Sequence, residues 1–219
     1  MSSVNIASAP GAGADEQQVV SSFREISTPI ISDSLQRLPG SGQLVPYHRD
    51  GRLVGPAFTV RTRPGDNLFI HRALDVARPG DVIVVDGGGE LTNALLGELM
   101  AEYAAARGIA GFVIDGAVRD IECFKALNLP CFARGNTHRG PYKDGPGELQ
   151  VPVSIAGHVV CPGDIVVADA DGVVSFPLAV ADELHAACQR KLDEEAEQLA
   201  EVRTGRFTRP WLDAIFGNS

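Results

Sequence analysis

An arginine and an aspartate stand side by side just after an apolar run, in the segment VIDGAVRD at residues 113–120. The apolar residues predict a buried strand over 109–115 with 116–120 as its exit loop, and ligands of α/β sheets gather at such carboxyl ends of strands. The planar guanidinium of Arg119 suits a carboxylate or an enolate oxygen, and Asp120 offers the hard oxygen ligand that Mg2+ or Mn2+ prefers. The pair is therefore a candidate site for a metal-bound oxo acid, with an ordinary ion pair in a surface loop as the simpler alternative.

A second candidate is GELM at residues 97–100, which places a glycine and a carboxylate inside an otherwise apolar stretch. A helix begins either near Leu91, which makes Gly97 an internal irregularity, or near Gly97, where free backbone amides form an anion site. Glu98 is either a functional carboxylate or half of an exposed Glu98/Glu102 face. The local sequence leaves both alternatives open.

Five other polar residues are weaker candidates. His71 lies in a helical segment, where a lone histidine is more often a structural hydrogen-bonding residue than a catalyst. His138 and Lys143 stand in a polar loop and could line the mouth of a pocket, but solvent-exposed loop residues are the preferred interpretation. Asp169 and Asp171 flank a turn in ADADGVV, and support of the turn is preferred over metal binding.

The composition restricts the partners. The formal net charge of −9 repels polyanions, and no run of Lys and Arg interleaved with aromatics offsets it, so nucleic acid is not expected. A dicarboxylate must then be captured by local cations or a bound metal. No apolar run approaches the roughly 20 residues that span a bilayer, so we expect no membrane partner and a cytoplasmic location. The four scattered cysteines lack a CxxC pair, which disfavours a disulfide framework and a structural zinc site.

The first part of the chain predicts helices followed by strands. Residues 1–14 have the small, flexible composition of a mobile tail. Helical periodicity covers 15–26, and Thr28-Pro29 is typical of an N-cap and first-turn proline for a second helix that runs to Leu38. The pattern then predicts a strand at 52–62, a helix at 68–77 and a buried strand at 81–86.

Glycines and short apolar runs organise the remainder. Gly87–Gly89 follows a strand without the motif of a phosphate loop, so nucleotide binding is not expected. A helical segment runs through Arg107, and Gly108 can end it in the left-handed conformation. Further elements are expected as a strand at 109–115, a short helix at 121–128, closely spaced strands after 135, a long charged helix at 178–202 and a short aromatic segment, FTRPWLDAIF. The pattern indicates a mixed α/β protein.

Glu98, twenty intervening residues, Arg119 and Asp120 reproduce an acidic-X20-Arg-Asp spacing. With it the chain resembles the RraA-like family, which includes 4-hydroxy-4-methyl-2-oxoglutarate/4-carboxy-4-hydroxy-2-oxoadipate aldolases and regulators of ribonuclease activity. The similarity runs from about Pro29 to Pro177 through GPAFTVR, PGDNL, PGDVIVVDGGG, GELM, GIAGFVIDGAVRD, FARG, VPVSIAG, PGDIVVAD and DGVV. The regulator branch lacks the complete spacing, which favours the aldolases, although Glu98 stands where the characterised aldolases have Asp.

The resemblance implies an α/β fold, the swivelling β/β/α sandwich, as a single catalytic domain over 15–219 that includes the C-terminal helix. It also implies a homotrimer, or a homohexamer formed as a dimer of trimers, with active sites between subunits. The cofactor would be a divalent metal, Mg2+ or Mn2+, bound directly by Asp120 and through water by Glu98.

For the substrate, the resemblance implies that Arg119 contacts the 2-oxo group and the derived enolate. The backbone of Gly97 to Met100, chiefly the amides of Leu99 and Met100, would receive the pyruvate-end carboxylate. The implied activity is a class II pyruvate aldolase acting on a small 4-hydroxy-2-oxo dicarboxylate, with oxaloacetate decarboxylation as a companion. Both reactions pass through a pyruvate enolate whose charge a metal and a guanidinium stabilise.

The sequence is compatible with three alternatives. The base for aldol cleavage is either a metal-linked water or a carboxylate from a neighbouring subunit. The chain could act primarily as a 2-oxo-acid decarboxylase. It could also be a non-catalytic regulator that binds a ribonuclease or helicase through its acidic surface.

Overall fold

The computed structural model describes residues 14–37 and 40–217, so the expected tail, apart from Ala14, lies outside the described residues. A central sheet has the strand order β1-β6-β5-β3-β2-β10-β11, with β4 beside β5 and β7 beside β2. Its strands are β1 (Val45–Pro46), β2 (Leu53–Thr62), β3 (Val82–Asp86), β4 (Ala94–Leu96), β5 (Gly111–Val118), β6 (Cys131–Asn136), β7 (Gly147–Leu149), β10 (Ile165–Asp169) and β11 (Gly172–Phe176). A separate hairpin consists of β8 (Val153–Ile155) and β9 (His158–Val160).

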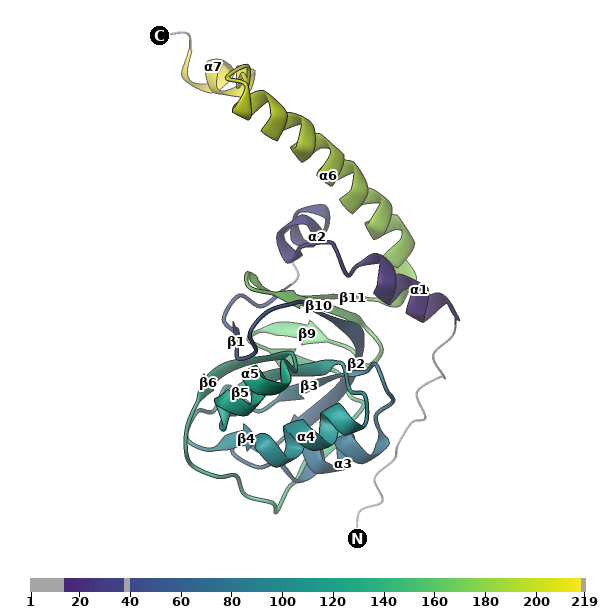
Figure 1. Cartoon of the computed structure of the whole chain (residues 1–219), viewed down its shortest axis with the longest axis vertical. Coiled ribbons are helices and arrows are strands. Elements are labelled where there is room, and N and C mark those ends of the chain that lie inside the picture. Colours follow the sequence, from purple (N-terminus) through teal and green to yellow (C-terminus); the bar gives the residue numbers. More distant parts are fainter. Residues whose placement is uncertain (1–13, 38–39, 218–219) are drawn as a thin grey trace.

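The helices lie in two groups (Figure 1). One group covers the parallel part of the sheet and consists of α3 (Leu68–Val76), α4 (Glu98–Ala106) and α5 (Ile121–Leu127). The other lies against β10 and β11 and consists of α1 (Ala14–Ser22), α2 (Thr28–Ser34) and α6 (Ala181–Arg203), with the short turn η1 (Leu178–Val180) before α6. A short helix, α7 (Pro210–Phe216), follows α6.

The parallel strands are continuous apolar runs because both faces of the sheet are covered. Strands β2, β3, β5 and β6 run parallel to one another. On one face, Ile83 and Ile114 pack with Leu74 of α3 and the other helical residues of that cluster. On the opposite face, Val84 packs with Val153 and the other apolar side chains of the β8–β9 hairpin. The resulting layers form a β/β/α sandwich in a single domain, which confirms the expected fold class.

A further apolar cluster attaches the N-terminal helices and α6 to the antiparallel end of the sheet. Phe23 lies 4.8 Å from Phe176 between ring centroids, and Ile31 and Leu184 belong to the same buried cluster. Beyond Leu192, which still packs against this cluster, α6 extends away from the body (Figure 1). Within 14–37 and 40–217, no helix combines the length and apolarity needed to cross a membrane.

Near the candidate residues the structure decides one open alternative and overturns one prediction. The helical segment before Arg107 begins at Glu98, the later of the two starts that the sequence leaves open, because β4 is buried and its Ala94 and Leu96 pair with β5. The strand predicted over 109–115 continues through Val118, because β4 and β6 supply partners on both sides of its last residues. Gly108, which follows this helix, has a φ of +72°, as predicted for a helix end.

The predicted N-terminal helices are also shorter than expected. Helix α1 ends at Ser22 instead of Ile26, and α2 ends at Ser34 instead of Leu38. Ser27 is the N-cap of α2, while Thr28 donates from its amide and its hydroxyl to the Asp169 carboxylate, at 2.8 and 2.6 Å. Thr28 is therefore not the N-cap that the sequence suggested. Its hydroxyl instead donates a hydrogen bond to the carboxylate of Asp169, which lies 141 residues away in the sequence. Asp169 therefore has a structural role, as the sequence predicts.

Candidate active site

The pairing of β4 with β5 brings the two candidate segments together. Ala94 lies opposite Ala117 and Leu96 opposite Val118, and the amide of Arg119 donates to the carbonyl of Leu96 at 2.9 Å. The chain leaves β4 at Gly97 and leaves β5 at Arg119, so both exits lie at the same edge of the sheet. This is the edge at which α/β proteins bind ligands.

Gly97 is the point of closest approach between these two exits. A Cβ built on Gly97 would lie 2.6 Å from Oδ2 of Asp120 and 3.0 Å from Nε of Arg119. Its φ of −152° is extended backbone that any residue adopts, so glycine is required here for space. The glycine is the N-cap of α4, which decides between the two helix starts that the sequence allowed.

The Asp120 carboxylate contacts both the first turn of α4 and the side chain of Arg119. Its Oδ2 accepts the amide hydrogen of Glu98 at 3.0 Å and lies 3.5 Å from Nε of Arg119. Its Oδ1 makes no hydrogen bond or ion pair within the described part of the chain. The residue has a φ of +56°, a left-handed conformation that costs an L-residue roughly 1 kcal/mol. An ion pair 41% and 43% exposed contributes little to stability by itself, so stability alone does not account for this strained and half-satisfied carboxylate.

The first turn of α4 has one unused amide. The amide of Glu98 is bound by Asp120, and those of Met100 and Ala101 donate to the carbonyl of Gly97 at 3.1 and 3.0 Å. The amide of Leu99 has no hydrogen-bond partner among residues 14–37 and 40–217. A helix N-terminus with a free N–H group favours an anion, so Leu99 is better placed than Met100 to receive a carboxylate.

A pocket of about 290 Å³ lies over this edge, close to the lower size limit of small-molecule sites, which is roughly 300 Å³. Its lining contains all six residues that the sequence suggested and six others: Asn67, His71, Leu95, Leu96, Gly97, Glu98, Leu99, Met100, Arg119, Asp120, Pro141 and Lys143. The side chain of Glu98 is exposed and makes no hydrogen bond or ion pair to any described residue. A larger hollow of about 620 Å³ lies elsewhere, beside Arg24 and Arg52, and contains none of these candidates.

His71 and Lys143 line the pocket, although the sequence favoured structural or solvent-exposed roles for them. Nε2 of His71 is buried without a hydrogen-bond partner among the described residues, so this atom gives no support to the structural hydrogen-bonding role that the sequence favours. Burial, and secondly the charge of Lys143, lower the pKa of His71, so its imidazole is neutral near pH 7. Lys143 is exposed, as expected, but on the wall of the pocket. His138 is exposed and lies outside the lining.

Asn67 is a pocket residue that sequence reasoning missed. Its Nδ2 donates to the carbonyl of Leu95 at 3.0 Å and contacts the sulfur of Met100 at 3.2 Å, while its Oδ1 is buried without a partner among the described residues. Asn67 and His71 are four residues apart, the spacing that places two residues on one face of a helix. That spacing is the signal that could have identified them as a pair.

The carboxylates of the pocket fit a hard divalent cation. No group of three His, Cys, Asp or Glu side chains forms a ready metal cluster in the described segments. Mg2+ is commonly held by only one or two carboxylates, with water and substrate as its remaining ligands. Asp120 Oδ1 and the Glu98 carboxylate are the free oxygens available for this. Burial and then the nearby Glu98, Glu102 and Asp120 raise the pKa of the Cys123 thiol, which indicates a negative field at this edge.

The chain is similar to known proteins in sequence and in fold. The RraA-like family model, described as Aldolase/RraA, matches residues 28–175. A protein of Halalkalibacterium halodurans named "Putative 4-hydroxy-4-methyl-2-oxoglutarate aldolase" is 42% identical over 202 residues, which are 91% of this chain and 96% of that protein. The crystal structure of an uncharacterized protein from Pseudomonas syringae superposes with a TM-score of 0.77 at 30% identity, covering 86% of this chain and 94% of that one. The RNA-processing inhibitor RraA from Thermus thermophilus gives a TM-score of 0.64 at 35% identity, covering 70% and 93%.

Proposed function

The chain belongs to the RraA-like family, and we propose that it is a carbon–carbon lyase, a class II pyruvate aldolase. Its substrate is a 4-hydroxy-2-oxo dicarboxylate such as 4-hydroxy-4-methyl-2-oxoglutarate, and decarboxylation of oxaloacetate is its companion reaction. One observation carries the proposal. Arg119, the spare oxygen of Asp120 and the free Leu99 amide converge on one pocket, and together they suit a 2-oxo acid whose reaction generates negative charge.

The residues have distinct roles in this proposal. The Leu99 amide at the N-terminus of α4 receives the carboxylate next to the 2-oxo group. The Arg119 guanidinium donates to the 2-oxo oxygen, and its attraction increases as that oxygen becomes an enolate. Asp120 and Glu98 would hold Mg2+ or Mn2+, with Glu98 acting through water. A divalent metal bound there would supply Lewis-acid stabilisation of the same developing charge.

The two reactions break different bonds but give the same intermediate, the pyruvate enolate. In aldol cleavage a base removes the proton of the C4 hydroxyl, the C4 oxygen forms a carbonyl as the C3–C4 bond breaks, and the electron pair of that bond forms the pyruvate enolate, while the C4 fragment leaves as a 2-oxo acid. In decarboxylation the bond to the distal carboxylate breaks, and carbon dioxide leaves behind the same enolate. Protonation then gives pyruvate. Only the first reaction needs a base for a hydroxyl proton, which we assign to water or to a carboxylate of a neighbouring subunit.

A homotrimer or a dimer of trimers would place such a carboxylate at the pocket. Leu99, in the lining of the pocket, is 86% exposed. Cover by a second subunit would remove that apolar surface from water. This supports a site between subunits.

The second candidate function is regulation of RNA processing without catalysis. The relative from Thermus thermophilus, whose name describes it as an RNA-processing inhibitor, and the net charge of −9 favour it. The complete set of Glu98, Arg119 and Asp120 favours catalysis. A stable protein partner together with no metal-dependent turnover would support regulation.

The two functions are separated by an assay of pyruvate release, coupled to lactate dehydrogenase. The substrates are 4-hydroxy-4-methyl-2-oxoglutarate and oxaloacetate, each tested with Mg2+, with Mn2+ and with EDTA. Metal-dependent release from both supports the aldolase, and release from oxaloacetate alone supports a decarboxylase. No release from either substrate would contradict the proposal and favour the regulator.

A further inference from the structure

The junction between β2 and α3 holds one wall of the pocket. The amide of Tyr142 donates to the carbonyl of Gly65 at 2.9 Å, and the amide of Asn67 donates to the carbonyl of Tyr142 at 3.0 Å. Immediately after Lys143, the amide of Asp144 donates to the Asp66 carboxylate at 2.7 Å. Lys143 therefore lies between two residues that the same junction binds.

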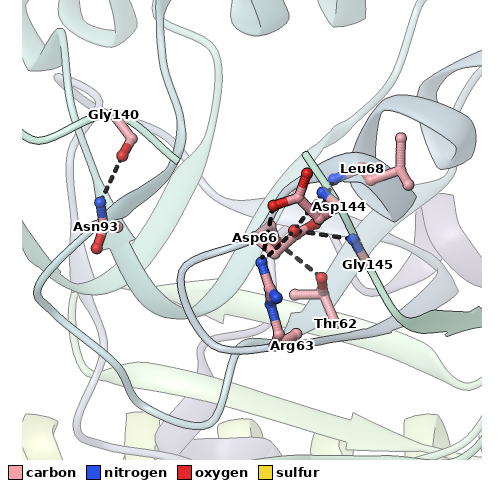
Figure 2. A network of polar contacts seen from close by, with 8 residues as sticks. All are labelled: Thr62, Arg63, Asp66, Leu68, Asn93, Gly140, Asp144 and Gly145. Atoms are coloured by element: carbon pink, nitrogen blue, oxygen red, sulfur yellow. Dashed lines mark hydrogen bonds and ion pairs between the residues drawn. The ribbon is translucent and has the colours of Figure 1, made fainter. Parts of the chain in front are cut away.

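Asp66 is the centre of this connection (Figure 2). Its side chain is 0% exposed and accepts hydrogen bonds from the amides of Leu68, Asp144 and Gly145, at 3.0, 2.7 and 2.9 Å. Nη2 of Arg63 lies 3.0 Å from its Oδ2. Burial acts to raise the pKa of Asp66, but these amides and Arg63 together hold it below its ordinary value. The carboxylate is thus a fully used, ionised anchor for the loop.

The other end of the loop has its own attachment. Nδ2 of Asn93 donates to the carbonyl of Gly140 at 2.5 Å (Figure 2), and the amide of Ala94 donates to the carbonyl of Arg139 at 2.9 Å. Gly140 lies against the guanidinium of Arg119, since a Cβ added there would be 3.1 Å from Nη1. The loop from 139 to 145 therefore runs past Arg119 and on to Asp66, with Lys143 near its Asp66 end.

Lys143 brings a second basic side chain into the pocket. Arg119 is the other lysine or arginine of the lining. The neighbouring Asp144 carboxylate lies 3.5 Å from Nη2 of Arg63, which draws it toward the Asp66 network. Lys143 itself forms no ion pair with a described residue. A cation without a protein counter-charge on a pocket wall is suited to an anionic group of a ligand.

We propose that Lys143 receives the distal carboxylate of the substrate, and that Asp66 is the positioning residue that holds it there. The inference rests on the proposed function and specifies how the pocket selects dicarboxylates. One carboxylate is met by the Leu99 amide near Arg119. The second needs its own cation, because a chain with a net charge of −9 repels a dianion. A lysine ammonium on a flexible stem supplies that charge, and the anchored loop limits where it can lie.

The test compares substrates with and without the distal carboxylate. Pyruvate release is measured from 4-hydroxy-4-methyl-2-oxoglutarate and from the monocarboxylate 4-hydroxy-2-oxopentanoate, and exchange of the pyruvate methyl protons is measured in D2O. For Lys143→Ala we expect a loss of about 10- to 100-fold in kcat/KM on the dicarboxylate, mainly through KM. The monocarboxylate reaction and the proton exchange should change by less than about twofold. Lys143→Arg should retain most of the selectivity, and Lys191→Ala, which removes the same charge from α6, should retain all of it.

Asp66→Asn tests the positioning role. The amide replaces an acceptor by a donor that faces backbone N–H groups, so the loop should loosen and selectivity should fall as it does in Lys143→Ala. The double variant should lose no more than Lys143→Ala alone, because both changes act on one interaction. The matched control is Asp81→Asn. Asp81 is a buried carboxylate that accepts from the Arg78 amide at 2.7 Å and pairs with the Arg78 side chain at 3.2 Å, outside the pocket lining.

The outcomes separate the two proposals. Equal losses on both substrates in Lys143→Ala, or no loss on either, would overturn the role of Lys143 and leave the aldolase intact. Equal losses on both substrates in Asp66→Asn would reduce Asp66 to a structural residue. If Asp66→Asn does not fold, Arg63→Met weakens the same network and should show a smaller loss on the dicarboxylate only. A wild-type protein with neither proton exchange nor cleavage would remove the proposed function itself.

Discussion

Asp66 and Asp120 are two aspartates at helix starts, each beside an arginine and each hydrogen-bonded to a backbone amide. They differ in how many of their carboxylate oxygens have hydrogen-bond partners. Asp66 is fully buried and uses both oxygens on the amides of Leu68, Asp144 and Gly145 and on Arg63. Asp120 is 43% exposed, has a positive φ and keeps one oxygen without a described partner. A carboxylate whose hydrogen bonds are complete stabilises the fold, and a strained carboxylate with a spare oxygen in a pocket is available for chemistry.

The largest expected effect on activity comes from removing the Asp120 carboxylate, which has one oxygen without a described partner. Asp120→Ala should reduce metal-dependent pyruvate release at least about 1,000-fold, because the proposed direct metal ligand is lost. The free energy of unfolding should fall by only about 1 kcal/mol, since a single bond to the Glu98 amide disappears. Turnover assays and denaturant unfolding measure the two effects. Glu122→Ala removes an equally acidic side chain from the first turn of α5 and serves as the control; near-wild-type turnover in Asp120→Ala would end its proposed role.

A smaller effect is expected from filling the gap beside Asp120. In Gly97→Ala the new methyl group would lie 2.6 Å from Asp120 Oδ2, so the carboxylate must move. We expect kcat/KM to fall by roughly 10- to 100-fold, because a displacement of this kind misplaces the reacting groups. Thermal unfolding should change little, since the half-exposed carboxylate can shift into solvent. Gly42→Ala is the control, because no atom lies within 4 Å of its added Cβ; equal activity in both variants would show that the close approach is not needed.

The largest effect on stability, beside the selective loss on the dicarboxylate described above, is expected at Asp66, the carboxylate whose hydrogen bonds are complete. Asp66→Asn should lower the free energy of unfolding by about 2–4 kcal/mol near pH 7, because buried amides and Arg63 lose their acceptor. The folded-state pKa of Asp66 lies below its unfolded value. Its stabilisation is therefore present above about pH 4 and is lost as the pH falls through the lower folded pKa. Urea unfolding of both proteins between pH 7 and pH 3 should show their difference shrink with acidity, and a constant difference would contradict this assignment.

Some features of the fold and of the site could be predicted from the sequence. The buried strands β3 and β5 were expected because uninterrupted apolar runs form buried parallel strands. The residues Glu98, Arg119 and Asp120 were expected because their types and their spacing along the chain carry the resemblance to the RraA-like family. Local signals also placed Gly108 at a helix end.

Short segments with ambiguous patterns were not predictable in the same way. Three apolar residues, Ala94 to Leu96, fit a strand or the beginning of a helix equally well. Their pairing with Ala117 and Val118 makes them a strand. Helix α4 can therefore begin only after them, with Gly97 as its N-cap. The free Leu99 amide follows from that start and from no local feature.

The amino-acid sequence by itself determined the mixed α/β class, the apolar strands and the acidic-X20-Arg-Asp set. Only the tertiary structure decided that His71 and Lys143, which look like ordinary helix and loop residues, share a pocket with that set. The bonds that hold Lys143 in place connect residues 78 and 79 positions apart, from Asp66 to the amides of Asp144 and Gly145. Local propensities carry no information about such pairs, because hydrogen bonds between distant segments form only when the whole chain is folded around its core.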